Sequence, residues 1–208
     1  MNNVKIFIVI VTVCCGIANV GFAQQPLVEK YLINGKLSEG ESALEKHLKQ
    51  NPKDDQARFG LGTLQMMKAV EHLAQSWYRF GINDNLDQIP FFRLPVPENK
   101  NPERVSYQDV RNVFKDMIKQ LDEADKTLAK ITSKDVKLPL HLFQFHLDID
   151  QDGMVTDDED LIRISQQYLG GGSILPDAKA REVVVAFDYS DVLWMRGYTH
   201  LLRSMLEF

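Results

Sequence analysis

Two long segments of this chain carry apolar residues at helical spacing, and this periodicity limits the possible folds more than any other feature. In residues 56–81 the apolar positions are Phe59, Met66, Val70, Leu73, Trp77 and Phe80. A similar stripe runs through residues 107–131, where charged residues fill the opposite face. Such a stripe is typical of a helix that buries one side against another helix. The chain is therefore predicted to be mainly α-helical and built from helical hairpins.

Cap and stop residues predict where the first helices begin and end. Ser38 followed by Glu41 is a capping-box pattern, which predicts a helix start at Ser38. Pro52 is expected to end that helix, because the residue before a proline avoids helical backbone angles. Asp54 or Asp55 is then expected to cap the long segment that follows.

The second half of the chain is predicted to hold three further helices and up to two short β-strands. Ser106 and Ser190 are expected to cap the first and last of these helices, and residues 160–169 to form the middle one. Residues 136–147 fit a strand or a helix, because their apolar residues match both spacings. Consecutive valines in residues 181–187 favour a strand.

The start of the chain has the pattern of a secretory signal peptide. Lys5 is followed by the apolar run of residues 6–13, and small residues precede the polar Gln24. This pattern predicts cleavage after Ala23 and a secreted or periplasmic protein. The run falls short of the ~20 residues that cross a bilayer, so cleavage is favoured over an uncleaved membrane anchor.

Four parts of the chain follow from these features. They are a signal peptide at 1–23, a helical region at 24–82, a proline-containing linker at 83–104 and a second helical region at 105–208. Both cysteines lie in the signal segment, so the mature chain has no disulfide, thiol nucleophile or thiolate metal site. The formal net charge of -5 argues against nucleic acid as a partner, and no membrane contact is expected after cleavage.

Residues 148–159 carry the chemistry that is most specific in this sequence. Asp148, Asp150 and Asp152 place three carboxylates two residues apart, and Gly153 allows the sharp turn that follows. Ca2+ takes six to eight oxygen ligands, so such carboxylates converge on it if the backbone wraps around the ion. The alternative is an acidic turn followed by a helix cap, since aspartate and glycine are common in turns.

The whole segment resembles the calcium-binding loop of the EF-hand family. The resemblance implies six ligand positions: Asp148, Asp150, Asp152, Met154 through its carbonyl, Thr156 directly or through water, and Glu159 through both carboxylate oxygens. It also implies that Val155 anchors the loop to the core. The chain offers no second loop of this kind. A lone site in an exported protein is expected to be structural and weak, rather than a sensor.

A second resemblance covers the helical region before the linker. The residues that carry it are Gly40, Leu44, His47, Leu48, Pro52, Ala57, Phe59, Leu61 and Gly62. They resemble the second helix of one tetratricopeptide unit and the first helix of the next, although Gly40 and His47 replace the usual alanines. This resemblance implies a scaffold for protein contacts. The alternative is an ordinary helical hairpin whose small residues let two helices approach.

An enzyme of unknown class is the competing hypothesis, with its site in residues 188–200. Asp188, Asp191 and His200 could form a carboxylate–histidine pair there, with Trp194 and Tyr198 expected in the core. No serine-hydrolase elbow, phosphate loop or dinucleotide motif is present, and the five histidines lack zinc spacing. A binding protein is therefore favoured over an enzyme.

The chain as a whole also resembles an uncharacterised group of secreted bacterial proteins with this order of helix, EF-hand loop and helix. The segments that carry this resemblance are residues 38–58, 94–101 and 184–202. It implies export and a calcium loop, but no activity. Calcium is thus the expected cofactor, and a protein that contacts the helical region is the expected partner.

Overall fold

The computed structural model describes residues 25–82, 94, 96–154, 156, 159–163 and 177–207. The predicted signal peptide and residues 83–93 of the predicted linker lie outside these ranges. So do Val155 and most of the predicted helix at 160–169, of which residues 161–163 are described as helical.

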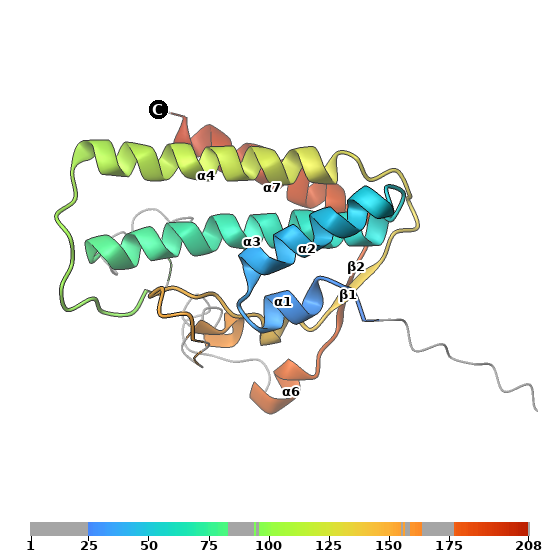
Figure 1. The fold of residues 1–208 in the computed structure, drawn as a ribbon, viewed down its shortest axis with the longest axis horizontal. Helices are drawn as coiled ribbons and strands as arrows, with labels where there is room; N and C mark the ends of the chain where they lie inside the picture. The colour runs from blue at the N-terminus through green and yellow to red at the C-terminus, as the bar shows by residue number, and fades with distance from the viewer. Residues whose placement is uncertain are drawn as a thin grey trace, which may run out of the picture.

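Helix α3 (Asp55–Phe80) runs through the centre of the molecule, antiparallel to α4 (Tyr107–Leu128). Helix α2 (Leu37–Gln50) packs on α3, and α1 (Glu29–Ile33) packs on α2. Helix α7 (Tyr189–Leu206) packs on α4 and lies behind it in Figure 1, with Leu202 and Leu206 in one core cluster with residues of α3. The apolar stripes of α3 and α4 therefore meet along their length, as helical spacing requires.

The remaining elements are short. Strand β1 (Leu138–Leu140) pairs antiparallel with β2 (Val185–Phe187), with Pro139 opposite Ala186. A 3-10 turn, η3, covers Leu142–Gln144, and α6 covers Asp177–Arg181. The prediction of a mainly α fold with two short strands is confirmed.

Side-chain caps fix several helix ends where the sequence predicted them. Asp54, rather than Asp55, caps α3, and its carboxylate accepts a hydrogen bond of 2.9 Å from the backbone N–H of Ala57. Ser106 forms a capping box with Asp109 at the start of α4. Both acceptors satisfy backbone N–H groups that have no partner inside the helix.

Two predicted caps were wrong. Helix α2 begins at Leu37, so Ser38 lies inside it, and Glu41 instead pairs with the ammonium group of Lys68 at 2.6 Å. Helix α7 is capped by Asp188, which forms a capping box with Asp191, so Ser190 lies inside that helix. At α7 the charged carboxylate of Asp188 is a stronger acceptor than the Ser190 hydroxyl, whereas α2 has no side-chain cap at its start.

Glycines let the central helices approach closely. A β-carbon added at Gly62 of α3 would overlap the side chain of Leu128 in α4, and one at Gly40 of α2 would lie 2.6 Å from Leu64 Cδ1. The core itself is apolar and continuous from α1 to the loop after β1, with Phe59, Phe145 and Ile149 almost fully buried. Trp194 was expected in this core, but 64% of it is exposed; this expectation was wrong.

The replacement Gly62→Ala is expected to lower the free energy of unfolding by about 1–3 kcal/mol, because the added methyl group forces Leu128 from its packed position. Urea unfolding followed by circular dichroism measures this loss. Gly197→Ala in α7 is the control, because no atom lies within 4 Å of its added β-carbon. It should gain up to about 1 kcal/mol from helix propensity. Equal effects at the two positions would contradict the packing argument.

Candidate metal centre

The loop that begins at Asp148 is closed at its base by backbone pairing. His146 and Asp160 form an isolated antiparallel bridge. The backbone N–H of Leu147 donates to the Glu159 carbonyl at 3.1 Å, and that of Leu161 donates to the Phe145 carbonyl at 2.9 Å. These bonds hold the two ends of the loop together, so the residues between them must curve back on themselves.

Inside the loop, three aspartates converge. Asp148, Asp150 and Asp152 each present a carboxylate oxygen, and these oxygens lie within 4.8 Å of one another. The backbone N–H of Asp152 donates to Asp150 Oδ1 at 3.1 Å, which folds the chain inward. Gly153 follows with φ of 74°, a left-handed conformation that favours glycine. The spacing of the aspartates therefore produces a compact group of oxygens.

A carboxylate oxygen of one of these aspartates has no hydrogen-bond donor. Asp148 Oδ1 is buried, and no described group donates to it. A buried carboxylate oxygen without a partner is costly, since it has lost water and gained nothing in return. A cation among the three aspartates would supply the missing interaction, so the donor set fits a hard metal ion.

Glu159 also turns into the loop, but it is held by the protein. Its side chain is 3% exposed, and its Oε1 accepts a hydrogen bond of 2.8 Å from the Ile149 backbone N–H. The hydroxyl of Thr156 donates to its Oε2 at 2.8 Å. The two predicted ligands from the end of the loop thus contact each other, and Glu159 reaches the backbone between Asp148 and Asp150. The side chain of Met154 points into solvent, which suits a residue expected to offer only its carbonyl.

Helix α3 contributes two residues that sequence reasoning missed. The backbone N–H of Asp148 donates to Glu71 Oε2 at 3.0 Å, and Gln75 Nε2 donates to the Asp148 carbonyl at 2.7 Å. These bonds fix the first residue of the loop against the central helix. The sequence did hold a sign of the role of Glu71. It is an acidic residue at a buried position of the helix between Leu64 and Ala74, where acidic residues are rare unless they have a partner.

Glu71 is electrostatically unusual. Burial, followed by the nearby charges of Asp148 and Glu159, raises its pKa from 4.5 to about 7. The hydrogen bond from Asp148 opposes this rise without cancelling it. Near neutral pH, the site therefore holds a buried carboxyl group that is only partly ionised.

Asp160 is the residue after the loop, where an EF-hand usually has an apolar side chain. It is 1% exposed and forms an ion pair with the guanidinium of Arg181. Its Oδ1 also accepts a hydrogen bond of 2.7 Å from the Arg163 backbone N–H. The Asp160 carboxylate thus caps residues 161–163, and Arg181 of α6 neutralises its charge. It is therefore not available to a metal ion.

The residues of the competing enzyme hypothesis are used elsewhere. Asp188 and Asp191 cap α7, while His200 lies 3.7 Å from the Asp125 carboxylate of α4. His200 is nine residues beyond Asp191 on one helix, a separation of about 13 Å at 1.5 Å per residue. These three side chains therefore do not form a carboxylate–histidine pair.

Comparison with protein-family models, with curated proteins and with solved structures finds no match for this chain. Within the described ranges, no helix is both long enough and apolar enough to span a bilayer.

The pKa of Glu71 predicts a pH dependence of stability. Because the folded protein holds this proton more tightly than the unfolded chain, the free energy of unfolding should fall as pH rises from 4.5 to 7. The loss from this group is about 3 kcal/mol. Glu71→Gln should remove it, so the difference in stability between variant and wild type should grow over this pH range in calcium-free buffer.

Urea unfolding at several pH values, with a chelator present, measures this difference. Glu45→Gln on the exposed face of α2 is the matched control and should leave the wild-type profile intact. Parallel profiles for wild type and Glu71→Gln would contradict the raised pKa, because they would show that Glu71 ionises normally in the folded state.

Proposed function

We propose that this protein is an exported helical protein whose loop at residues 148–159 binds one Ca2+ ion in a structural role. Two observations on the same aspartates carry the proposal. Asp148, Asp150 and Asp152 bring carboxylate oxygens within 4.8 Å of one another, and Asp148 Oδ1 is buried without a donor. The left-handed Gly153 and the inward position of Glu159 add support, since both occur at the positions that the EF-hand resemblance requires.

The chemistry of the donors favours calcium over other metals. Each proposed ligand offers oxygen, through carboxylate, hydroxyl or backbone carbonyl, and hard cations prefer oxygen. Asp148, Asp150, Asp152 and Glu159 would bind through side chains, Met154 through its carbonyl, and Thr156 directly or through water. Ca2+ accepts this irregular set of six to eight ligands, whereas Mg2+ demands a near-ideal octahedron.

Calcium would act by relieving repulsion and fixing the loop. Asp148 and Glu159 lie near the buried Glu71, and this accumulated negative charge would destabilise the metal-free fold. Glu159 would exchange its bonds with Thr156 and Ile149 for the ion. Because Asp148 is bonded to α3, the bound ion would attach the whole loop to the central helix. Exported calcium modules bind with dissociation constants of about 0.1–1 mM, which suits a permanently occupied site.

A thermal melt with and without calcium tests this proposal. At ten to a hundred times the dissociation constant, an ion that binds only the folded state stabilises it by about 1.4–2.7 kcal/mol. That gain raises the melting temperature of a chain of this size by several degrees. Asp148→Asn and Glu159→Gln should lose the shift, while Asp135→Asn, in an exposed turn outside the loop, should keep it. An unchanged wild-type melt at about 10 mM Ca2+, which is at least ten times the expected dissociation constant, would contradict the proposal.

The helical region is proposed to serve protein contacts, as the tetratricopeptide resemblance implies. One observation favours this role over an enzyme: a polar groove opens on α3 and α4, on the side of the calcium loop. By contrast, in the Asp188–His200 region Asp188 and Asp191 cap α7, and His200 forms an ion pair with Asp125 at the surface.

A further inference from the structure

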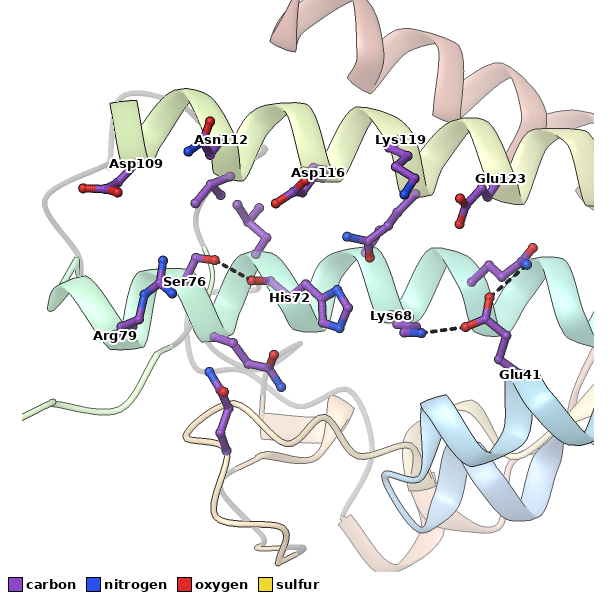
Figure 2. Close-up of a pocket in the computed structure, with 18 residues that line it drawn as sticks. Glu41, Lys68, His72, Ser76, Arg79, Asp109, Asn112, Asp116, Lys119 and Glu123 are labelled. Atoms are coloured by element: carbon purple, nitrogen blue, oxygen red, sulfur yellow. Dashed lines mark hydrogen bonds and ion pairs between the residues drawn. The ribbon is translucent and has the colours of Figure 1, made fainter. Parts of the chain in front are cut away.

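A groove of about 490 Å³ lies between α3 and α4 (Figure 2). Residues 65–79 of α3 form one wall, and residues 109–123 of α4 form the other. Glu41 of α2 stands at one end, where it pairs with Lys68, and Gln151 of the calcium loop lies toward the other. This groove lies over part of the core and beside the loop, and none of the proposed metal ligands lines it.

The dimensions of the groove suit a single extended chain. Each wall covers fourteen residue steps, or about 21 Å at the helical rise of 1.5 Å per residue. A volume of 490 Å³ spread over that length leaves a narrow channel. An extended peptide advances about 3.3–3.6 Å per residue, so six residues fill it. The floor is apolar and buried, and it consists of Ala69, Leu73, Val113 and Met117.

The walls are rich in carboxamide groups, which have the same donor and acceptor as a peptide bond. The groove is lined by five of them: Gln65, Gln75, Asn112, Gln120 and Gln151. Gln65 is 7% exposed, and its Oε1 and that of Gln120 are buried without any donor. Gln65 Nε2 donates to Glu41 Oε1 at 3.1 Å, which fixes the orientation of that amide. A modest rotation of these side chains toward a ligand with N–H groups would satisfy them.

Charged residues along α4 add a directional pattern. Asp116, Lys119 and Glu123 face the groove in the order minus, plus, minus (Figure 2). No hydrogen bond or ion pair within 4 Å joins them to another described residue, although the charge of Asp116 acts on His72 across the groove. Across the groove, burial and then the charge of Lys68 lower the pKa of His72, so its imidazole is neutral near pH 7. Asp116, Lys119 and Glu123 are therefore the charged groups of the groove that are open to pairing with a ligand.

We propose that this groove binds an extended polypeptide segment of about six residues, with charges in the order plus, minus, plus on alternate residues. Alternate side chains of an extended chain point to opposite sides, about 6.7 Å apart along one side. Along the helix axis, Lys119 lies about 4.5 Å from Asp116 and about 6 Å from Glu123. These separations are comparable to the spacing of side chains along one side of the peptide. The remaining side chains would rest on the apolar floor. The inference rests on the protein-contact part of the proposed function and does not depend on calcium.

Calorimetric titration with two capped peptides tests the proposal. The first probe is acetyl-Lys-Ala-Glu-Ala-Lys-Ala-amide, and the second, acetyl-Glu-Ala-Lys-Ala-Glu-Ala-amide, reverses each charge. The first should bind about tenfold more tightly, because exposed ion pairs each contribute little and three act together. The triple variant Asp116→Lys, Lys119→Glu, Glu123→Lys should reverse this preference. Gln120→Leu should weaken both peptides several-fold and remain folded, since it removes a buried unpaired oxygen.

The same titration in saturating calcium and in chelator separates the two proposals. Binding in both conditions supports the groove, even if the calcium melt shows no shift. Three results would overturn the inference: neither peptide binds at millimolar concentration, the triple variant keeps the wild-type preference, or a linear triamine binds while both peptides fail. The last result would assign the groove to a small cationic ligand.

Discussion

The repulsion among carboxylates beside helix α3 is the constraint on which the candidate site depends. Asp148, Asp150 and Asp152 converge within a few ångströms, Glu159 turns inward beside them, and Glu71 reaches the loop from the helix. Backbone hydrogen bonds satisfy Glu159 and Glu71, but they leave Asp148 Oδ1 without a partner. A chain that folds these groups together without a cation gives up stability, and a divalent ion would restore it.

Helix α3 links the core, the loop and the groove. Its buried stripe packs on α2 and α4, and the overlap that a side chain at Gly62 would cause shows how closely α4 approaches. Glu71 and Gln75, on one side of this helix, hold Asp148. Gln75 also lines the groove, together with Gln151 of the loop. The loop and the groove therefore meet on this side of α3 and share residues.

The sequence predicted what depends on local periodicity and missed what depends on distant partners. The long helices, the Ser106 capping box and the Asp54 cap follow from neighbouring residues, and each was found. Ser38 is not a cap, because α2 already begins at Leu37, and Glu41 binds Lys68, which lies far along the chain. Trp194 matches a core pattern but stacks on Tyr198 at the surface, since no element covers that face of α7 among the described residues.

In the candidate site, too, the sequence predicts what neighbouring residues determine and misses what depends on distant contacts. The order of Asp148, Asp150, Asp152 and Gly153 is sufficient to predict a loop that gathers oxygens. The roles of Glu71 and Gln75 could not be assigned, because the contact joins residues more than seventy positions apart. The groove was also invisible, since its walls come from two helices whose facing sides become known only once they pack.

Equilibrium dialysis with radioactive calcium measures the central property directly. The wild-type chain should hold one ion per molecule at millimolar calcium, and Asp148→Asn or Glu159→Gln should hold almost none. Absence of bound calcium in the wild type, or an ion retained by both variants, would contradict the assignment of the loop as a calcium site.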